Sequence, residues 1–336
     1  MRAIVVGAGG ISRCWFPALK QRGVEVVAVV DLDAELAGRR VEEHQLVDAQ
    51  ALTDLDEALR TVEADFAVDL TTPGAHEKVT TACLSAGLDV ISEKPMAENM
   101  DQCRRMVAAA EKSGRLYMVS QSRRYNPLHA RVADTVASGR LGRLVEVHCD
   151  FFLAAHFGGF RAEMPHVLLN DMAIHHFDMA RMFTGTDPVS VVAEEFTPLH
   201  SWFRDGPNAY ASFTMSGDVR FTYRGSWCAE GCSTGWDGHW RITGSKGTLM
   251  YTPDGLSGEV ITGEPVEGLQ RTTNALEPAP ERDVACGWDG ALAEFLAALG
   301  GGPTPQGECH DNLWSMAMVC GAIESAESDR RVVCTG

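Results

Sequence analysis

The first 125 residues alternate between short apolar runs and longer amphipathic segments. The apolar runs, rich in β-branched residues, cover residues 3–6, 24–30, 66–70, 89–92 and 116–120. The segments between them have helical patterns, and two end at a glycine, Gly87 and Gly114. Near-continuous apolar strands that are each followed by a helix predict a parallel sheet covered on both faces. Ligands of such sheets bind at the carboxyl ends of the strands.

The pattern changes after about residue 121. An alternating strand is predicted over residues 144–152, and several strand-like runs between 189 and 250 predict an antiparallel sheet. Residues 252–285 are rich in Gly, Pro, Glu and Thr and are expected to form a loop with one short strand pair. Helices are predicted over residues 128–138, 168–183, 287–299 and 311–326. We therefore divide the chain into an α/β domain, residues 1–121, and a second domain, residues 122–336.

Composition and charge exclude several classes of protein. The chain has 336 residues, which favours two domains or one elaborated domain. It has no apolar run long enough for a transmembrane helix, and its first residues lack the apolar core of a signal peptide. The net charge of -17 opposes binding to nucleic acid. Ten dispersed cysteines suit a reducing cytoplasm, and we interpret the Cys228 and Cys232 pair near His239 as scattered thiols, so no metal is expected.

A glycine-rich turn follows the first predicted strand and opens a helix. The sequence Gly7-Ala8-Gly9-Gly10-Ile11-Ser12 fits the dinucleotide fingerprint, with Ser12 as a small third residue. Asp31 ends the next strand, where a carboxylate accepts hydrogen bonds from the adenosine ribose and repels a 2′-phosphate. The cofactor is therefore predicted to be NAD. Arg39 and Arg40 lie nearby and keep NADP open as an alternative.

These residues resemble the Gfo/Idh/MocA oxidoreductases, a family that includes glucose–fructose oxidoreductase and inositol dehydrogenase. The resemblance runs essentially end to end and is weakest between residues 195 and 285. The matching elements are Gly7–Ile11, Asp31, Thr72-Pro73-Gly74-Ala75-His76, Glu93-Lys94-Pro95, Ser122-Arg123-Arg124-Tyr125, Asp171–Asp178, Thr243–Leu249 and Ser325-Ala326. The resemblance implies an N-terminal Rossmann domain and a C-terminal α+β domain with an open, mostly antiparallel sheet. It also implies sheet-to-sheet homodimers or homotetramers.

The predicted cofactor contacts are Gly7, Gly9, Gly10, Ile11, Ser12, Asp31, Thr72, Pro73, His76, Glu93 and Lys94. Lys94 follows the fourth apolar run, where its ammonium can hydrogen-bond a substrate hydroxyl and stabilise an alkoxide. Asp171 and His175 are one helical turn apart, and a histidine of near-neutral pKa can accept the hydroxyl proton. The family's sugar-binding lysine and acid/base pair match these three residues, which we predict to be catalytic.

The predicted substrate contacts are Arg124, Tyr125, His156, Asn170, Asp171 and His175. The predicted reaction is hydride transfer between nicotinamide and a secondary alcohol of a sugar, sugar derivative or cyclitol. Three alternatives stay open: transient oxidation for epimerisation or elimination with tightly bound NAD, NADPH-dependent reduction of a keto sugar or imine, and a non-catalytic nucleotide-binding regulator. For Arg124, an interdomain salt bridge is an equal alternative, and for Asp178 a structural role.

Overall fold

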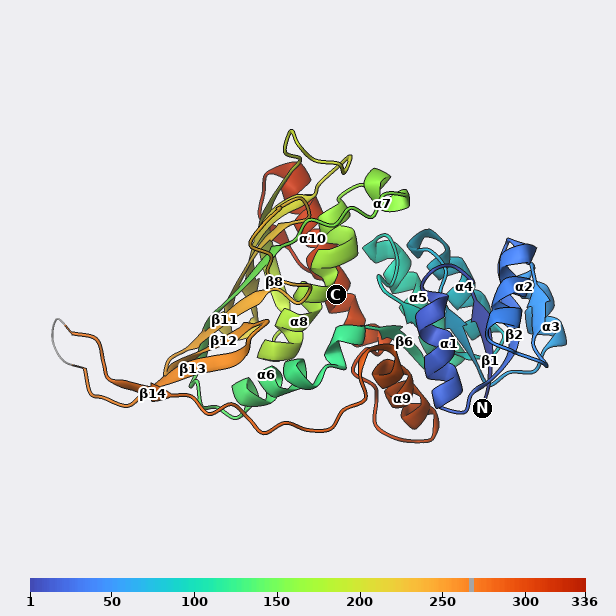
Figure 1. Cartoon of the computed structure of the whole chain (residues 1–336), viewed down its shortest axis with the longest axis horizontal. Helices are drawn as coiled ribbons and strands as arrows, with labels where there is room; N and C mark the ends of the chain where they lie inside the picture. Colours follow the sequence, from blue (N-terminus) through green and yellow to red (C-terminus); the bar gives the residue numbers. More distant parts are fainter. Residues whose placement is uncertain (266–268) are drawn as a thin grey trace. The chain divides into compact units, whose positions relative to one another are not determined.

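A computed structural model describes residues 1–265 and 269–336 and separates the chain into two units (Figure 1). The first unit comprises Met1–Asn126 and Val284–Met316, and the second comprises Pro127–Asp283 and Ala317–Gly336. Residues 266–268, within the predicted loop 252–285, lie outside the described residues. Residues 284–316 thus join the first unit, although the sequence boundary left them in the second domain. The reason is packing, because the Phe295 and Phe66 rings lie 5.4 Å apart in the core of that unit.

The first unit contains a sheet of six parallel strands in the order β3-β2-β1-β4-β5-β6. The strands are β1 (Arg2–Val6), β2 (Glu25–Val30), β3 (Gln50–Leu52), β4 (Phe66–Asp69), β5 (Asp89–Glu93) and β6 (Tyr117–Ser120). This confirms the predicted parallel Rossmann sheet. The sequence analysis missed β3, because this three-residue edge strand is largely exposed and has no apolar run.

Helices connect these strands and bury their apolar sides against the sheet. They are α1 (Ser12–Gln21), α2 (Ala34–Glu43), α3 (Leu55–Thr61), α4 (Pro73–Ser85) and α5 (Met100–Ser113). The 3-10 turn η1 (Ser122–Arg124) and the helix α9 (Gly287–Leu299) follow β6 in the sequence and also belong to this unit. The side chains of Asp33, Asp54 and Asn99 accept backbone N–H groups at the starts of α2, α3 and α5. Gly114 ends α5 in the left-handed conformation that the sequence predicts.

The second unit contains a nine-stranded sheet in the order β14-β13-β12-β11-β7-β10-β9-β8-β15. The strands are β7 (Leu144–Phe152), β8 (Pro188–Phe196), β9 (Asn208–Met215), β10 (Arg220–Ser226), β11 (His239–Gly244), β12 (Gly247–Thr252), β13 (Gly255–Ile261), β14 (Thr273–Ala275) and β15 (Val332–Val333). Among the described strands of this second sheet, only β7 and β10 pair in parallel, so the sheet is mostly antiparallel, as predicted.

Helices of the second unit lie against one face of this sheet (Figure 1). They are α6 (Pro127–Ala137), α7 (Phe160–Glu163), the π-helix η2 (Leu168–Ala173), α8 (Ile174–Thr184) and α10 (Cys309–Ser328), within which the division between the units falls. Phe177 of α8 packs edge-on against Phe213 of β9, with centroids 4.9 Å apart.

Two large apolar side chains of the second sheet are exposed, Val192 of β8 at 41% and Tyr210 of β9 at 43%. No helix in the described part of the chain is long and apolar enough to cross a membrane.

The predicted helix over residues 168–183 differs from the observed one at its start. Its first six residues, Leu168–Ala173, form the π-helix η2, and regular α-helix begins at Ile174. The predicted spacing of one turn between Asp171 and His175 assumed a continuous α-helix. Asp171 instead lies in the wider turn of the π-helix. Single π turns inside α-helices are frequent at functional sites.

Candidate active site

The glycine-rich turn is shaped by close approach to the neighbouring strand. Gly7 has a φ of +98°, and a Cβ there would lie 2.7 Å from the carbonyl carbon and oxygen of Leu70. Only glycine fits this position. Gly9 and Gly10 have open space where a side chain would be, and Ser12 is buried with its hydroxyl donating to the Gly9 carbonyl at 2.7 Å. The turn therefore has the shape that a pyrophosphate needs to approach the start of α1.

Asp31 connects the end of β2 to this turn. One carboxylate oxygen accepts the Ala8 N–H at 2.7 Å, and the other accepts the Asp33 N–H at 2.9 Å. These bonds hold the carboxylate beside the turn, where the sequence analysis expected it to bind the ribose hydroxyls. The residues of the turn thus fit NAD.

Arg40, one of the two arginines that kept NADP open as an alternative, is buried against the glycine-rich turn. Its side chain is only 3% exposed, and Nε donates to the Ala8 carbonyl and the Ser12 hydroxyl, both at 3.0 Å. Arg39 pairs with Glu35 one helical turn away, at 3.0 Å. Both cations are already engaged, which weakens the argument for a 2′-phosphate. Periodicity alone did not reveal Arg40 as a support for the turn.

The residues after β4 and β5 are held together by His76. This side chain is fully buried, and its two ring nitrogens lie 2.9 Å from the Pro95 carbonyl and 3.0 Å from the Thr71 carbonyl. Thr72 precedes α4 and Pro73 is its first residue, as its missing N–H allows. Of the predicted cofactor contacts, His76 thus contacts backbone in the interior, whereas Thr72 and Pro73 lie at the carboxyl end of β4.

Glu93 fixes the turn from which Lys94 projects. Its carboxylate is 7% exposed and accepts indole N–H bonds from Trp15, at 2.8 Å, and Trp288, at 2.7 Å. The other oxygen accepts the Lys94 backbone N–H at 3.2 Å, and the Lys94–Pro95 peptide is cis. Glu93 therefore holds the backbone at Lys94 in place. The two tryptophans were missed because they lie 78 and 195 residues away in the sequence.

In the second unit, Asp171 is engaged by an arginine. Arg161 donates through Nε to Asp171 Oδ2 at 2.6 Å, and the Asp171 side chain is 11% exposed. The guanidinium also lies over the rings of Phe157 and Phe160, 5.3 and 4.7 Å from their centroids. This pair holds the Asp171 carboxylate, a hydrogen-bond acceptor, in a fixed position. No sequence motif predicted this pair.

Of the other acidic and histidine residues of this helix, His176 and Asp178 are more deeply buried than His175. His175 is partly buried, whereas His176 is fully buried with Nε2 3.2 Å from the Trp236 carbonyl. Asp178 is 1% exposed and lies 4.0 Å from Arg181, which also pairs with Asp187 at 2.8 Å. Asp178 thus belongs to a buried ion-pair network, the structural alternative that its sequence position left open.

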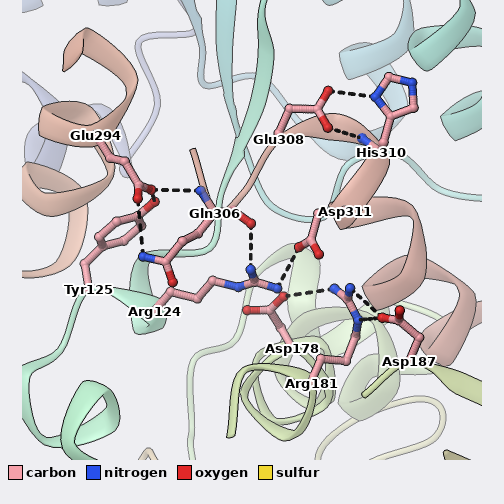
Figure 2. A network of polar contacts seen from close by, with 10 residues as sticks. All are labelled: Arg124, Tyr125, Asp178, Arg181, Asp187, Glu294, Gln306, Glu308, His310 and Asp311. Carbon is pink, nitrogen blue, oxygen red and sulfur yellow. Dashed lines mark hydrogen bonds and ion pairs between the residues drawn. The ribbon is translucent and has the colours of Figure 1, made fainter. Parts of the chain in front are cut away.

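Figure 2 shows the contacts of Arg124 and Tyr125 within the first unit. Arg124 donates to the Gln306 carbonyl at 2.6 Å and pairs with Asp311 at 2.9 Å, while the Tyr125 hydroxyl donates to Glu294. These contacts tie the end of β6 to residues 294–311. Two further predicted substrate contacts lie in the second unit. His156 is exposed and stacks on Trp202 at 3.7 Å, and Asn170 donates to the Pro165 carbonyl at 3.0 Å.

One group among the described residues has metal-ligand atoms close together, Glu308, Cys309 and His310. Glu308 accepts the His310 backbone N–H at 2.9 Å and lies 2.8 Å from Nδ1 of the same residue. Hydrogen bonds to Glu308 and Glu111 raise the pKa of His310. Helix capping and ion pairing explain this arrangement without a metal.

Comparisons with known proteins cover both units. The family model described as an oxidoreductase family with an NAD-binding Rossmann fold, GFO_IDH_MocA, matches residues 1–121, and the GFO/IDH/MocA C-terminal domain model matches residues 129–250. A 1,5-anhydro-D-fructose reductase of Ensifer adhaerens is 27% identical, covering 96% of this chain and 95% of that protein. An inositol 2-dehydrogenase of Arthrobacter sp. (strain FB24) is 34% identical, covering 57% and 56%.

A solved structure extends the comparison to the fold. An oxidoreductase from Agrobacterium radiobacter, in complex with NAD+, L-tartaric acid and magnesium, aligns with a TM-score of 0.84 at 19% identity. The alignment covers 99% of this chain and 98% of that chain. At this identity the likeness concerns the fold.

Proposed function

Because the chain belongs to the Gfo/Idh/MocA family of NAD-binding oxidoreductases, we propose that it oxidises or reduces a sugar, sugar derivative or cyclitol at a secondary carbinol carbon. The observation that carries this proposal is the anchoring of Lys94 on the buried Glu93 carboxylate at the carboxyl end of β5. The names of two relatives, an inositol dehydrogenase and an anhydrofructose reductase, support polyhydroxylated substrates.

The chain's own residues have distinct roles in this proposal. Lys94 donates a hydrogen bond to the substrate hydroxyl and stabilises negative charge on its oxygen as the proton leaves. His175 accepts that proton in oxidation and returns it in reduction. Asp171, held in place by Arg161, accepts a hydrogen bond from the substrate and orients it. NAD, when bound, supplies the nicotinamide that accepts or delivers the hydride.

A reductive direction has a specific observation in its favour. One relative that matches nearly the whole chain is a reductase, whereas the inositol dehydrogenase matches little more than half of it. We therefore infer that keto sugars are substrates as well as polyols. The same residues serve both directions, because the acid that protonates an alkoxide is the base that deprotonates the alcohol.

The assay follows absorbance at 340 nm while the protein is mixed with NAD or NADH and a panel of inositols, hexoses, amino sugars and keto sugars. We expect a rise with NAD and one class of polyol, or a fall with NADH and the matching ketone. Lys94→Met and His175→Gln should reduce kcat at least a hundredfold, with the Kd for NAD within several-fold of wild type. Lys112→Met, on the exposed end of α5, is the matched control. Full activity in either site variant would contradict these roles.

If no panel member reacts while NAD copurifies with the protein, an internal redox cycle replaces the dehydrogenase proposal.

We also propose that the protein is a cytoplasmic homodimer or homotetramer. Exposed apolar side chains such as Val192 and Tyr210 on the second sheet support the association. Light scattering during size-exclusion chromatography measures the oligomeric mass, and a monomer would contradict this part of the proposal.

A further inference from the structure

The chain enters the π-helix η2 through a residue with an unusual backbone conformation. His166 has a φ of +50°, in the left-handed region that non-glycine residues rarely adopt. Its carbonyl accepts the Asn170 N–H at 2.9 Å and so starts the turn that includes Asp171. Surrounding contacts must hold such a conformation in place, because the backbone alone does not favour it.

Those contacts come from the loop after β8. The backbone N–H of His166 donates to the Asp205 carboxylate at 3.2 Å. The next two backbone N–H groups, of Val167 and Leu168, donate to the carbonyls of Asp205, at 3.3 Å, and Gly206, at 3.1 Å. The position of the loop at residues 205–206 therefore sets the position of the first turn of η2.

The His166 side chain is 22% exposed and lies among carboxylates from three different segments. Nδ1 lies 2.5 Å from Glu195 Oε2 of β8, and Nε2 lies 3.5 Å from Glu327 Oε1 of α10. The third carboxylate is that of Asp205. In the described part of the chain, these three carboxylates are the ionisable partners of His166. No lysine or arginine in that part forms an ion pair with Glu195, the partner of His166.

Glu195 depends on this histidine. Its side chain is 8% exposed, and His166 is its ion-pair partner among the residues that the structure describes. Oε1 is buried without a hydrogen bond and packs against Gly206, where a Cβ would lie 2.1 Å from it. A buried carboxylate without a paired cation is strongly destabilising. Loss of the proton from His166 would therefore disturb Gly206, the residue that holds the backbone of Leu168.

We propose that His166 and Glu195 form a protonation-dependent clamp that positions the Asp171 turn for catalysis. Both are positioning residues, because they act through Asp171. This inference rests on the proposed function for its catalytic consequence. The structural part, an ion pair that holds the start of η2, stands without it.

The direction of the pH effect follows from the environment of each group. The hydrogen bond to Glu195 raises the pKa of His166, and burial raises the pKa of Glu195. Each group therefore binds its proton more tightly in the folded protein than in the unfolded chain. The His166 contribution to stability is complete below the ordinary histidine pKa, near 6.5, and is lost as pH rises through the raised value. The clamp should thus hold near pH 6 and loosen in alkaline solution.

The first test needs no substrate. The ring proton of His166 is followed by NMR through a pH titration of the wild-type protein and assigned by its absence in His166→Gln. We expect a midpoint above 6.5 that falls by at least half a unit in Glu195→Gln. We also expect the difference in Tm between wild type and His166→Gln to be larger at pH 6 than at pH 9. His200→Gln, an exposed histidine in the same loop, is the control. An ordinary midpoint, or a pH-independent difference in Tm, overturns the clamp.

The second test uses the substrate found with the 340 nm panel. We expect the wild-type kcat to decline in alkaline solution, where the clamp loosens. His166→Gln and Glu195→Gln should each lower kcat about tenfold and should no longer show this decline, while the Kd for NAD stays at the wild-type value. The double variant should be no slower than the worse single variant. Wild-type kcat and pH profile in both variants overturn the positioning role. Inactivity of the wild-type protein contradicts the proposed function instead, and the NMR titration still decides the clamp.

Discussion

Arg40 offers a direct test of how this chain prepares its cofactor site. The guanidinium is almost fully buried and donates to the Ala8 carbonyl and the Ser12 hydroxyl, both parts of the glycine-rich turn. In Arg40→Met the apolar stem of the side chain is retained, and the Nε–H group that donates to both acceptors is lost. We expect weaker binding of NAD, because the turn is no longer held in the conformation that receives the pyrophosphate.

The magnitude follows from these two bonds. A hydrogen bond from a charged donor contributes about 1.5–3 kcal/mol, and the two share one guanidinium, so their effects do not add fully. The Glu43 pair contributes little, because that carboxylate is 40% exposed. We therefore expect a loss of about 2–4 kcal/mol in the stability of the first unit. We expect about 1–2 kcal/mol of it to appear in binding, a rise in Kd of roughly fivefold to thirtyfold.

Titration calorimetry with NAD measures the Kd, and thermal unfolding measures the loss of stability. Arg39→Met is the matched control, since Arg39 lies on the exposed side of α2 and pairs with the exposed Glu35. The kcat at saturating NAD should stay within about twofold of wild type, because Arg40 acts on the turn. Unchanged affinity and Tm in Arg40→Met, or an equal effect in Arg39→Met, would refute the reasoning.

Three further predictions test other parts of the site. Gly7→Ala should abolish measurable NAD binding and lower the Tm, since its Cβ would overlap the backbone after β4; calorimetry that found wild-type affinity would contradict this. Glu93→Gln should lower kcat at least tenfold with little change in the Kd for NAD, because the amide cannot accept all the N–H groups that the carboxylate accepts. Arg161→Met should lower kcat about tenfold, because the Asp171 carboxylate loses the N–H donor that holds it in place; an unchanged kcat would show that Asp171 does not depend on this arginine.

The sequence was sufficient for the parallel sheet and its ligand-binding edge. Buried strands and the glycine-rich turn leave local signals, namely apolar runs and a residue that needs a positive φ. The edge strand β3 has no such signal, because its residues face solvent. Residues 284–316 could not be assigned from local pattern either, since the helix α9 is placed by contacts with strands more than two hundred residues earlier.

The catalytic candidates were found by motif, but most of their supporting contacts were not. The pairing of Arg161 with Asp171 and the indole bonds to Glu93 depend on rotamers and on distant segments. Asp171 itself lies in a π-helix, whereas the sequence spacing was interpreted as a continuous α-helix. The clamp at His166 depends on its positive φ, which no side-chain pattern indicates.

Direct hydride transfer to the cofactor is the central claim, and an isotope experiment tests it most directly. The panel polyol that gives the largest rise at 340 nm is deuterated at its carbinol carbons and mixed with the protein and NAD, and the NADH is analysed by mass spectrometry. The account predicts one deuterium in each NADH formed, carried on the nicotinamide ring. NADH that forms without deuterium, or deuterium that is released to solvent, would contradict it.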